Sequence, residues 1–393
     1  MTIALDKYVG REQAFIKHSL LRSYFSGLIH KIVSRYDEFV YVDGFSGPWE
    51  SADEGFGDTS FGISLAEMRK AKQAWASRGR TIRMRALLIE KRHKAFADLQ
   101  TIPARFPDIE VEPFRGEFVA FVPTLLARIP TNAFSFLFID PKGWRVDMKG
   151  IAPLLQRPNC EVLFNFMFEF INRAASMSET ATVQGLDELI VAPGWRPRLV
   201  GATAAAGKRL ADVRKEILVK AFSDTMRSVG SYEFVAETPI FRPMKDRTLY
   251  SLIYATRRSP GIEVFRKAQI ETLVTQENVR TSMRKAKTHG EQSELFGQVE
   301  MGKTETEMYL EAERRKADAL LLGLAPAYPD RATYGDVWPR VLARHAVTKP
   351  ELNRMAAKHR KEGRLYFPDW LPGQKVPSDD GRIARSAVIE PIV

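Results

Sequence analysis

The feature that most constrains the fold is a series of short apolar runs that alternate with helical segments up to about residue 167. The five runs are Glu38–Asp43, Met84–Glu90, Ile109–Phe114, Ala133–Asp140 and Cys160–Met167. Runs that are apolar on both faces are typical of strands in a parallel sheet that is covered by helices on both sides. Strands that alternate with helices in this way predict an α/β fold with a doubly wound, Rossmann-like sheet.

The segments between and after these runs predict the helices and two more strands. Apolar residues recur at helical spacing over 12–35, 61–75, 91–99, 118–127 and 147–155. A mostly helical insertion is expected over about 172–228, interrupted by a turn at 192–195. The runs Tyr232–Phe241 and Thr248–Thr256 are close enough in sequence to pair antiparallel, which completes a seven-stranded sheet.

Three regions are expected along the chain. They are a Rossmann-like domain over 1–260, a helical connector over 261–328 with an exposed charged helix, and a small domain over 329–393. In the small domain Thr333 is expected to cap one helix, and Thr348 and Glu351 form a capping box that opens a second. A tight pair of helices followed by a strand pair predicts a winged helix-turn-helix domain.

The positive charge is concentrated in the last region. The chain has 59 basic and 48 acidic side chains, a net charge of +11. Residues 331–393 carry +5 of this charge and the other 330 residues carry +6, so the C-terminal part is several times denser in positive charge. A basic domain favours a polyanionic partner, although a small domain with a solvated basic face would give the same count.

Cysteine, histidine and hydropathy exclude several classes of protein. A single cysteine excludes a disulfide scaffold and any multi-cysteine zinc site, and six histidines without a His-x-x-x-His pair argue against a metal centre. The chain shows no signal-peptide h-region and no apolar run of about 18 residues, so we expect a cytoplasmic protein without a membrane partner.

Candidate site residues follow the ends of the predicted strands, where open α/β sheets bind ligands. The first strand ends in Asp43-Gly44-Phe45-Ser46-Gly47, whose glycines let the backbone approach a ligand closely. This turn lacks the Gly-x-Gly-x-x-Gly and Gly-Lys-Ser/Thr patterns, which disfavours dinucleotides and triphosphates. Its carboxylate suits a cationic ligand, whereas the competing interpretation is simply a tight strand–helix turn.

Two more acids end the next two strands. Glu90 could accept both hydroxyls of a ribose, although Lys91 and Arg92 beside it favour a surface ion pair as the alternative. Glu117 could accept a hydrogen bond from an adenine amino group, or Gly116-Glu117-Phe118 could merely begin a helix.

The fourth strand end carries the most specific local signal, Asp140-Pro141-Lys142-Gly143-Trp144. An acid at the end of a buried strand is desolvated and faces the expected cleft, where it could accept protons from a substrate amine. Trp144 could stack on a planar substrate. Asn165, in the fifth strand, either reaches the same cleft or bonds a neighbouring strand, and Asn172 and Arg173 follow it.

Cys160 starts the fifth strand, at the end away from the expected cleft. We therefore interpret it as a buried structural thiol, which argues against a mechanism that needs a covalent cysteine adduct, such as cytosine carbon-5 methylation.

Taken together, the strand ends over residues 36–257 resemble the motifs of class I S-adenosylmethionine-dependent methyltransferases. The matching segments are YVDGFSGPW, LLIEK, RGEF and FIDPKGW. The whole chain resembles the bacterial three-Cys-motif partner (TcmP) family, through Lys17-His18, Tyr24, DGFSGPW, FIDPKGW, NFM, INR and the C-terminal winged helix. One departure is that Lys-Gly-Trp follows Asp140-Pro141, where an amino-methyltransferase has Pro followed by an aromatic residue.

The resemblance implies S-adenosylmethionine as cofactor and a three-Cys-motif protein as partner. It implies a set of cofactor-binding residues: Lys17, Asp43, Gly44, Phe45 and Gly47, with Glu90 at the ribose, Glu117 at the adenine and Asp140 near the transferred methyl group. Asp140, Pro141 and Trp144 are the expected catalytic residues.

Two hypotheses from different classes follow. The first is an enzyme that methylates a nitrogen or ribose oxygen of a nucleic acid, although a protein or small-molecule acceptor stays possible. The second is a non-catalytic nucleic-acid-binding regulator or scaffold with a degenerate methyltransferase domain. In either case the expected phosphate contacts are basic side chains of the second C-terminal helix and its end: Lys349, Arg354, Lys358, Arg360, Lys361 and Arg364. A winged helix that binds a protein instead remains the alternative.

Overall fold

The computed structural model describes residues 8, 11–47, 51, 53, 55–205, 210–242, 248–289 and 304–386 of the 393-residue chain. Pro48 and Trp49 of the DGFSGPW segment, and the last residues of the predicted small domain, lie outside the described residues. None of the helices within the described ranges is long and apolar enough to cross a membrane.

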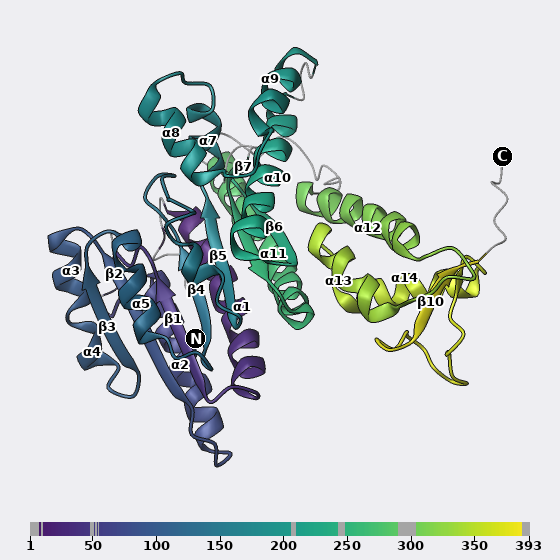
Figure 1. Cartoon of the computed structure of the whole chain (residues 1–393), viewed down its shortest axis with the longest axis horizontal. Helices are drawn as coiled ribbons and strands as arrows, with labels where there is room; N and C mark the ends of the chain where they lie inside the picture. Colours follow the sequence, from purple (N-terminus) through teal and green to yellow (C-terminus); the bar gives the residue numbers. More distant parts are fainter. Residues whose placement is uncertain are drawn as a thin grey trace.

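A seven-stranded sheet forms the centre of the larger part of the molecule (Figure 1). Its strands are β1 (Glu38–Asp43), β2 (Arg83–Glu90), β3 (Glu110–Arg115), β4 (Phe134–Ile139), β5 (Cys160–Phe166), β6 (Phe234–Phe241) and β7 (Thr248–Thr256). They lie in the order β3-β2-β1-β4-β5-β7-β6, with β1 to β5 parallel and β7 antiparallel to both of its neighbours. The predicted doubly wound seven-stranded sheet is confirmed.

The strand order reverses between β1 and β4, which lie side by side although β2 and β3 separate them in sequence. All residues of β1, β4 and β5 are buried, as expected for strands with helices on both faces. We call the edge at which β1 to β5 end the carboxyl edge, and the opposite edge the amino edge. A switch point of this kind is where open α/β sheets bind ligands, at the carboxyl edge.

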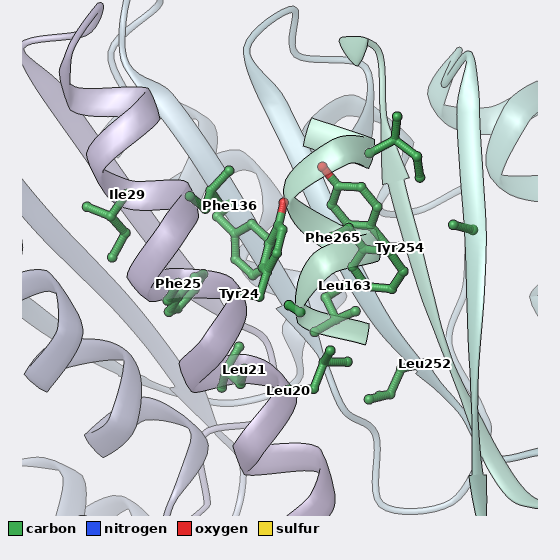
Figure 2. Packing of buried hydrophobic residues seen from close by; sticks show 14 of the residues in the cluster. Leu20, Leu21, Tyr24, Phe25, Ile29, Phe136, Leu163, Leu252, Tyr254 and Phe265 are labelled. Carbon is green, nitrogen blue, oxygen red and sulfur yellow. The ribbon is translucent and has the colours of Figure 1, made fainter. Parts of the chain in front are cut away.

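Helices cover both faces of the sheet. On one face lie α1 (Glu12–Val33), α2 (Ser60–Ala76) and α11 (Ser259–His289), and α1 packs Tyr24 and Phe25 against Phe136 of β4 (Figure 2). On the other face lie α5 (Val122–Arg128), α6 (Ala152–Leu155) and α10 (Leu210–Gly230), which pack on the alternate side chains of the same strands. Each strand therefore contributes to two separate hydrophobic cores.

The predicted helices are present with two corrections. The segment predicted as 118–127 begins as a 3-10 helix, η2 (Phe118–Phe121), before α5. The helix predicted over 147–155 is wrong for its first half, because only Ala152–Leu155 is helical. The Asp147 carboxylate accepts a hydrogen bond from the Gly150 N–H at 2.9 Å, which holds a turn there in place of a helix. The short helices α3 (His93–Leu99) and α4 (Ile102–Arg105) connect β2 to β3.

The predicted insertion after β5 is mostly helical within its described residues. It contains α7 (Phe168–Ala174), α8 (Thr180–Leu189), α9 (Trp195–Ala205) and most of α10, with the expected turn before Trp195. Gly194 in that turn has a φ of +74°, which glycine adopts without strain. Figure 1 shows α7 and α8 beyond the ends of β4 and β5, at the carboxyl edge.

Residues 304–386 form a second, smaller assembly, which we call the C-terminal unit. It comprises α12 (Glu305–Leu324), β8 (Ala332–Thr333), α13 (Tyr334–Arg344), α14 (Lys349–Lys361), β9 (Leu365–Tyr366) and β10 (Arg382–Arg385). The three strands form an antiparallel sheet in the order β8-β10-β9. Capping boxes open α13 at Thr333 and α14 at Thr348, as predicted.

The predicted connector over 261–328 divides between the two parts. Helix α11 packs along α1 and the large sheet, whereas α12 packs against α13 and α14 and buries Leu310, Ala317 and Leu321. The charged helix is therefore half-buried rather than fully exposed. The domain limits themselves stay a prediction.

A buried arginine joins the two parts. The Arg266 guanidinium on α11 donates hydrogen bonds to the carbonyls of Leu342 at 2.5 Å and Ala343 at 3.1 Å, in the last turn of α13. It also donates to the Glu237 carbonyl of β6 at 3.1 Å. Burial lowers the pKa of Arg266 to about 10, so the side chain still carries its charge at neutral pH. This cation satisfies carbonyls at a helix C-terminus, where the helix dipole favours positive charge.

Candidate functional site

A cleft of about 530 Å³ opens at the carboxyl edge of the sheet. Four successive strand ends supply its walls: Gly44 and Phe45 after β1, Glu90 at the end of β2, Gly116 and Glu117 after β3, and Pro141 to Arg145 after β4. The strand ends that the sequence singled out thus meet around one space, except for Asp43 and Asp140, which lie beside it.

A second cavity of about 260 Å³ adjoins the first, and Phe45 lines both. Its other walls come from the start of α1, from the turn after β1, from the start of α2 and from the end of β4: Arg11, Gln13, Ala14, Lys17, His18, Gly47, Asp58, Thr59, Ser60 and Asp140. Lys17 and Gly47, both expected at the cofactor, lie here rather than in the larger cleft.

Asp43 lies behind the turn and lines neither cavity. Its carboxylate accepts hydrogen bonds from the Tyr41 hydroxyl at 2.8 Å, the Ser60 hydroxyl at 2.9 Å and the Phe45 N–H at 3.0 Å. Burial raises the pKa of Asp43 to about 6, partly offset by these hydrogen bonds. In this structure Asp43 therefore fixes the conformation of the glycine turn.

Two glycines shape the cleft at positions where a side chain would not fit. A Cβ atom on Gly44 would lie 3.0 Å from the Phe118 ring. Gly116 has a φ of +153°, and a Cβ atom there would lie 2.7 Å from the Phe121 ring. Both turns therefore need glycine to bring their backbones this close to the cleft.

Glu90 and Glu117 differ in exposure. Glu90 is only 4% exposed, and one of its oxygens accepts the Arg92 N–H at 2.7 Å and faces the Arg92 Nε at 3.4 Å. The surface ion pair that competed with a binding role is thus present, yet Glu90 lines the cleft as well. The Glu117 side chain is 67% exposed and pairs with Lys91 at 3.2 Å, so it lies at the rim of the cleft.

Asp140 has two partners from distant parts of the chain. Its carboxylate forms an ion pair with Lys17 of α1 and accepts a hydrogen bond from the Asn165 amide at 2.5 Å. Asn165 therefore bonds the carboxylate that follows the neighbouring strand β4, and it lines neither cavity itself. Within the part of the chain that the structure describes, the buried Oδ1 of Asn165 has no hydrogen-bond partner.

Trp144 connects the cleft to the insertion. A Cβ atom on Gly185 of α8 would lie 3.0 Å from the Trp144 ring, so the indole packs closely on that helix. Pro141 and Trp144 line the cleft, and the Arg145 guanidinium lies 5.4 Å from the centre of the Trp144 ring. The turn at Gly143, with a φ of +107°, makes this change of direction possible without strain.

Sequence reasoning missed three side chains at the second cavity. Arg11 pairs with Asp58 at 3.0 Å, and Ser60 bonds Asp43 because Thr59, rather than Ser60, caps α2. Arg11 and Asp58 lie 47 positions apart in flanking loops, and local patterns do not pair such residues.

His18 lines the second cavity, and its imidazole is neutral. Burial, and then the positive charge of Lys17, holds the pKa of His18 well below its usual range. Its Nδ1 lies 3.0 Å from the Tyr8 hydroxyl. Within the described ranges, no three His, Cys, Asp or Glu side chains group as a metal site requires.

The six basic residues expected to bind phosphate differ in their exposure and in their side-chain partners. Arg354, Lys358 and Lys361 are exposed at helical spacing on one face of α14, and the Lys358 ammonium lies 3.8 Å from the Glu362 carboxylate. The Lys349 ammonium pairs with Asp379 at 2.8 Å, and Arg364 lies 3.5 Å from Glu362. Arg360 lies over Trp370, with 4.5 Å between the guanidinium carbon and the ring centre.

Two further expectations concern β5 and α7. Cys160 is buried at the amino edge, where burial raises the pKa of its thiol and the Tyr232 hydroxyl lies 3.5 Å from the sulfur. Its structural role is confirmed. Asn172 accepts a hydrogen bond from Arg214 at 2.6 Å, and Arg173 is exposed next to Phe170.

The sequence matches no protein-family model and no curated protein. Among solved structures, a Legionella pneumophila protein of the DUF519 family is similar at a TM-score of 0.39 and 12% identity, over 66% of this chain and 91% of that one. A loganic acid methyltransferase solved with SAH is similar at a TM-score of 0.31 and 8% identity, over 75% of this chain and 93% of that one. Likenesses this distant carry no argument about function. The α/β character of the fold rests on the seven-stranded, mostly parallel sheet itself, in which β7 is antiparallel to its neighbours.

Proposed function

We propose that this protein is an S-adenosylmethionine-dependent methyltransferase of the three-Cys-motif partner type, acting on a nucleic acid. One observation carries the proposal: Gly44, Glu90 and Glu117, predicted from separate motifs, line one cleft that adjoins the Lys17–Asp140 pair. The cleft also lies at the switch point of the sheet, where ligands bind in this class of fold.

The residues present fit such a cofactor. A cavity of about 530 Å³ is within the usual range for small-molecule sites. Glu90 is placed to accept the hydroxyls of a ribose, and Glu117 at the rim to accept from an adenine amino group. The second cavity offers the cations Arg11 and Lys17 to the carboxylate of an amino-acid group.

The bound cofactor would supply a methyl group on positively charged sulfur. The acids at the carboxyl edge favour such a cation through their negative charge, which acts more strongly in a partly buried site than in water. Asp43 contributes to this field from behind the turn, because it is fully buried and close enough to Asp140 for the two charges to interact.

Asp140 is the group that we assign to the acceptor. Its carboxylate can accept a hydrogen bond from an acceptor N–H or O–H and then take the proton. Lys17 and Asn165 hold that carboxylate in one orientation, and Trp144 offers an aromatic wall for a planar base. The rest of the catalysis would come from positioning and the exclusion of water.

The C-terminal unit supports a nucleic-acid acceptor. We propose that it is a winged helix, since α12, β8, α13, α14, β9 and β10 follow one another as helix, strand, helix pair and strand pair. The exposed face of α14 formed by Arg354, Lys358 and Lys361 would then contact phosphates. A three-Cys-motif protein is the proposed protein partner, on the strength of the family resemblance.

One observation favours a second candidate, a non-catalytic nucleic-acid-binding regulator. Lys17 already neutralises Asp140, and Lys142-Gly143 replaces the usual residues after Pro141, so the acceptor pocket departs from that of an amino-methyltransferase. A protein that binds both cofactor and nucleic acid without turnover would have these features.

The test of the proposal is methyl transfer from radiolabelled S-adenosylmethionine to bulk RNA and bulk DNA, with the purified protein alone and with a three-Cys-motif protein added. We expect label in one nucleic acid, and none with Asp140→Ala. If the protein binds both cofactor and nucleic acid but transfers no label, alone or with the added protein, the non-catalytic regulator is favoured over the methyltransferase.

The α14 face is tested by the salt dependence of nucleic-acid binding. Each phosphate contact contributes about 0.7 to 0.9 to the slope of log affinity against log salt concentration. Removing Lys358 and Lys361 should therefore reduce the slope by about 1.4 to 1.8. The control is Lys220→Ala, an exposed lysine of α10 that pairs with Asp224. If the slope is unchanged when Lys358 and Lys361 are removed, this face of α14 does not contact phosphates.

A further inference from the structure

The helical insertion presents an exposed aromatic and cationic surface beside the proposed acceptor pocket. Phe170 is 41% exposed and Met177 54% exposed, and Arg173 between them is exposed as well. The three residues recur at a spacing of three and four positions, on α7 and directly after it. We call them the α7 ridge. Exposed large apolar side chains grouped in this way are typical of a binding surface.

The α7 ridge lies at the carboxyl edge. Helix α7 begins at Phe168, three positions after Asn165, whose amide holds Asp140. Arg145, from the loop that lines the cleft, donates to the carbonyl of Ala181 at 3.2 Å, four positions after Met177. Arg145 thus joins the wall of the cleft to the start of α8, which follows the α7 ridge in sequence. Figure 1 shows α7 and α8 together at this edge.

The chemistry of the surface matches single-stranded nucleic acid. The Arg173 guanidinium lies 4.8 Å from the centre of the Phe170 ring, and Arg145 lies 5.4 Å from that of Trp144. Arginines over exposed aromatic rings can stack on bases and contact phosphates, and this combination binds single strands with little sequence preference. Arg214 adds a third cation below the ridge, where it donates to the carbonyl of Asn172.

Charge also limits where a strand could lie. A shallow cavity along α8 is lined by the acids Asp147, Asp187 and Glu188 and by one cation, Lys149, so its lining carries a net negative charge that disfavours phosphates. The one acid within α7, Glu169, pairs with Arg242. A polyanion is therefore favoured at Phe170 and Arg173 and disfavoured along α8, while the exposed Glu179, two positions after Met177, limits the ridge at that end.

We infer that the α7 ridge and Arg145 bind unpaired nucleotides of the acceptor strand next to the cleft. This inference rests on the proposed function for its choice of ligand. It deepens that function, because it makes the acceptor a single-stranded or locally opened segment. The C-terminal unit then supplies phosphate contacts to the rest of the nucleic acid.

The experiment compares binding of a fluorescein-labelled single-stranded oligonucleotide, as RNA and as DNA, with binding of the same sequence as a duplex. The test variant is the double substitution Phe170→Ala and Arg173→Ala. The control is Val200→Ala with Lys220→Ala, which removes another exposed apolar side chain and another exposed cation, both outside the ridge. Melting temperature and S-adenosylmethionine binding are measured for each variant, so that misfolding is detected separately.

We expect the test variant to lose about tenfold or more in affinity for the single strand, since stacking of one base on an aromatic ring accounts for a loss of this size. Duplex affinity and cofactor affinity should change by less than about threefold, and the control should match the wild type. If the protein binds one of the two single-stranded oligonucleotides more tightly, that preference shows whether the acceptor strand is RNA or DNA.

Three results would overturn the inference. In the first, the test variant binds the single strand as tightly as the wild type does. In the second, it loses equal affinity for the single strand and the duplex. In the third, it binds nucleic acid normally but no longer binds the three-Cys-motif protein. A protein that fails to bind S-adenosylmethionine but shows the predicted single-strand loss would contradict the proposed function and leave this inference standing.

Discussion

The two edges of the large sheet each hold a cavity and buried carboxylates, yet they differ in what those carboxylates contact. At the amino edge, a cavity of about 260 Å³ is lined in part by Glu161, Arg258 and Gly261. At the carboxyl edge, the cavity beside Asp140 has the same volume. Cavity size therefore does not distinguish a candidate site from a packing feature in this molecule.

Glu161 at the amino edge and Asp140 and Glu90 at the carboxyl edge have different kinds of partner. Glu161 accepts hydrogen bonds from the hydroxyls of Tyr24 at 2.7 Å and Thr256 at 2.8 Å, which belong to the helices and strands of the core. Burial raises its pKa, and a Cβ atom on Gly261 would collide with its carboxylate. Asp140 and Glu90 instead contact the cationic side chains Lys17 and Arg92. Glu161 is therefore bonded within the packed core, whereas Lys17 and Arg92 are partners that a ligand at the switch point could replace. The difference concerns these three acids, because Glu38 at the amino edge also faces a cation, Arg85 at 3.5 Å.

Of the variants that test this comparison, Asp140→Asn is expected to have the largest effect, which is on the rate of methyl transfer. The substitution keeps the shape but removes the charge that accepts a proton, and loss of such a group typically costs about 100-fold or more in rate. Methyl transfer to nucleic acid should fall by at least that factor, while cofactor affinity measured by calorimetry stays within about threefold. The matched control, Glu161→Gln at the amino edge, should retain transfer. Equal rates for Asp140→Asn and wild type would contradict the role of Asp140.

A second experiment separates binding from stability at the two edges. Glu90→Ala should weaken S-adenosylmethionine binding by about tenfold or more, because it removes a charged hydrogen-bond acceptor from the proposed ribose site. Its melting temperature should stay close to that of the wild type. Glu161→Ala should do the opposite and lower the free energy of unfolding by about 1–3 kcal/mol, because the hydroxyls of Tyr24 and Thr256 lose their acceptor.

Calorimetric titration measures the cofactor affinity of both variants, and thermal melting measures their stability. The distinction between the edges would break if Glu161→Ala weakened cofactor binding as much as Glu90→Ala, or if Glu90→Ala lowered stability as much as Glu161→Ala.

The smallest expected effect concerns pH. The pKa of Asp43 is raised from 3.8 to about 6, so the folded protein holds this proton more tightly than the unfolded chain. Its contribution to stability is therefore fully present below about pH 4 and is lost as pH rises through about 6. Asparagine does not ionise, so the stability of wild type relative to Asp43→Asn should fall between about pH 4 and 7. Denaturant melts across that range measure it.

The same ionisation should affect cofactor binding in the reverse direction. A cationic ligand prefers the ionised carboxylate, so affinity for S-adenosylmethionine should rise from about pH 5 to pH 7, by up to a few-fold. The uncharged sulfur of S-adenosylhomocysteine should reduce that rise, and Asp43→Asn should abolish it. An identical pH dependence for both ligands would show that Asp43 does not act on the sulfonium charge.

Most of the sheet could be predicted from the sequence because its strands are apolar on both faces. The bounds of β1 were predicted without error and those of β5 to within one residue. The helix predicted over 147–155 failed because the Asp147 side chain closes a turn, and periodicity does not register such a contact.

The site could be predicted only in part. Residues at strand ends were found because topology brings the ends of parallel strands together. The Lys17–Asp140 pair joins residues 123 positions apart, and Arg11, Asp58 and Ser60 complete the second cavity through equally non-local contacts. Burial of Asp43 behind its own turn depends on the hydroxyls of Tyr41 and Ser60, which no local pattern assigns to it.

The central claim is that the carboxyl edge binds S-adenosylmethionine, and the most direct measurement is calorimetric titration of the purified full-length protein with that ligand. The account predicts one binding event per chain, weakened by Glu90→Ala and unchanged by Glu161→Gln. Absence of measurable binding at millimolar ligand, or binding that Glu90→Ala leaves unchanged, would contradict it.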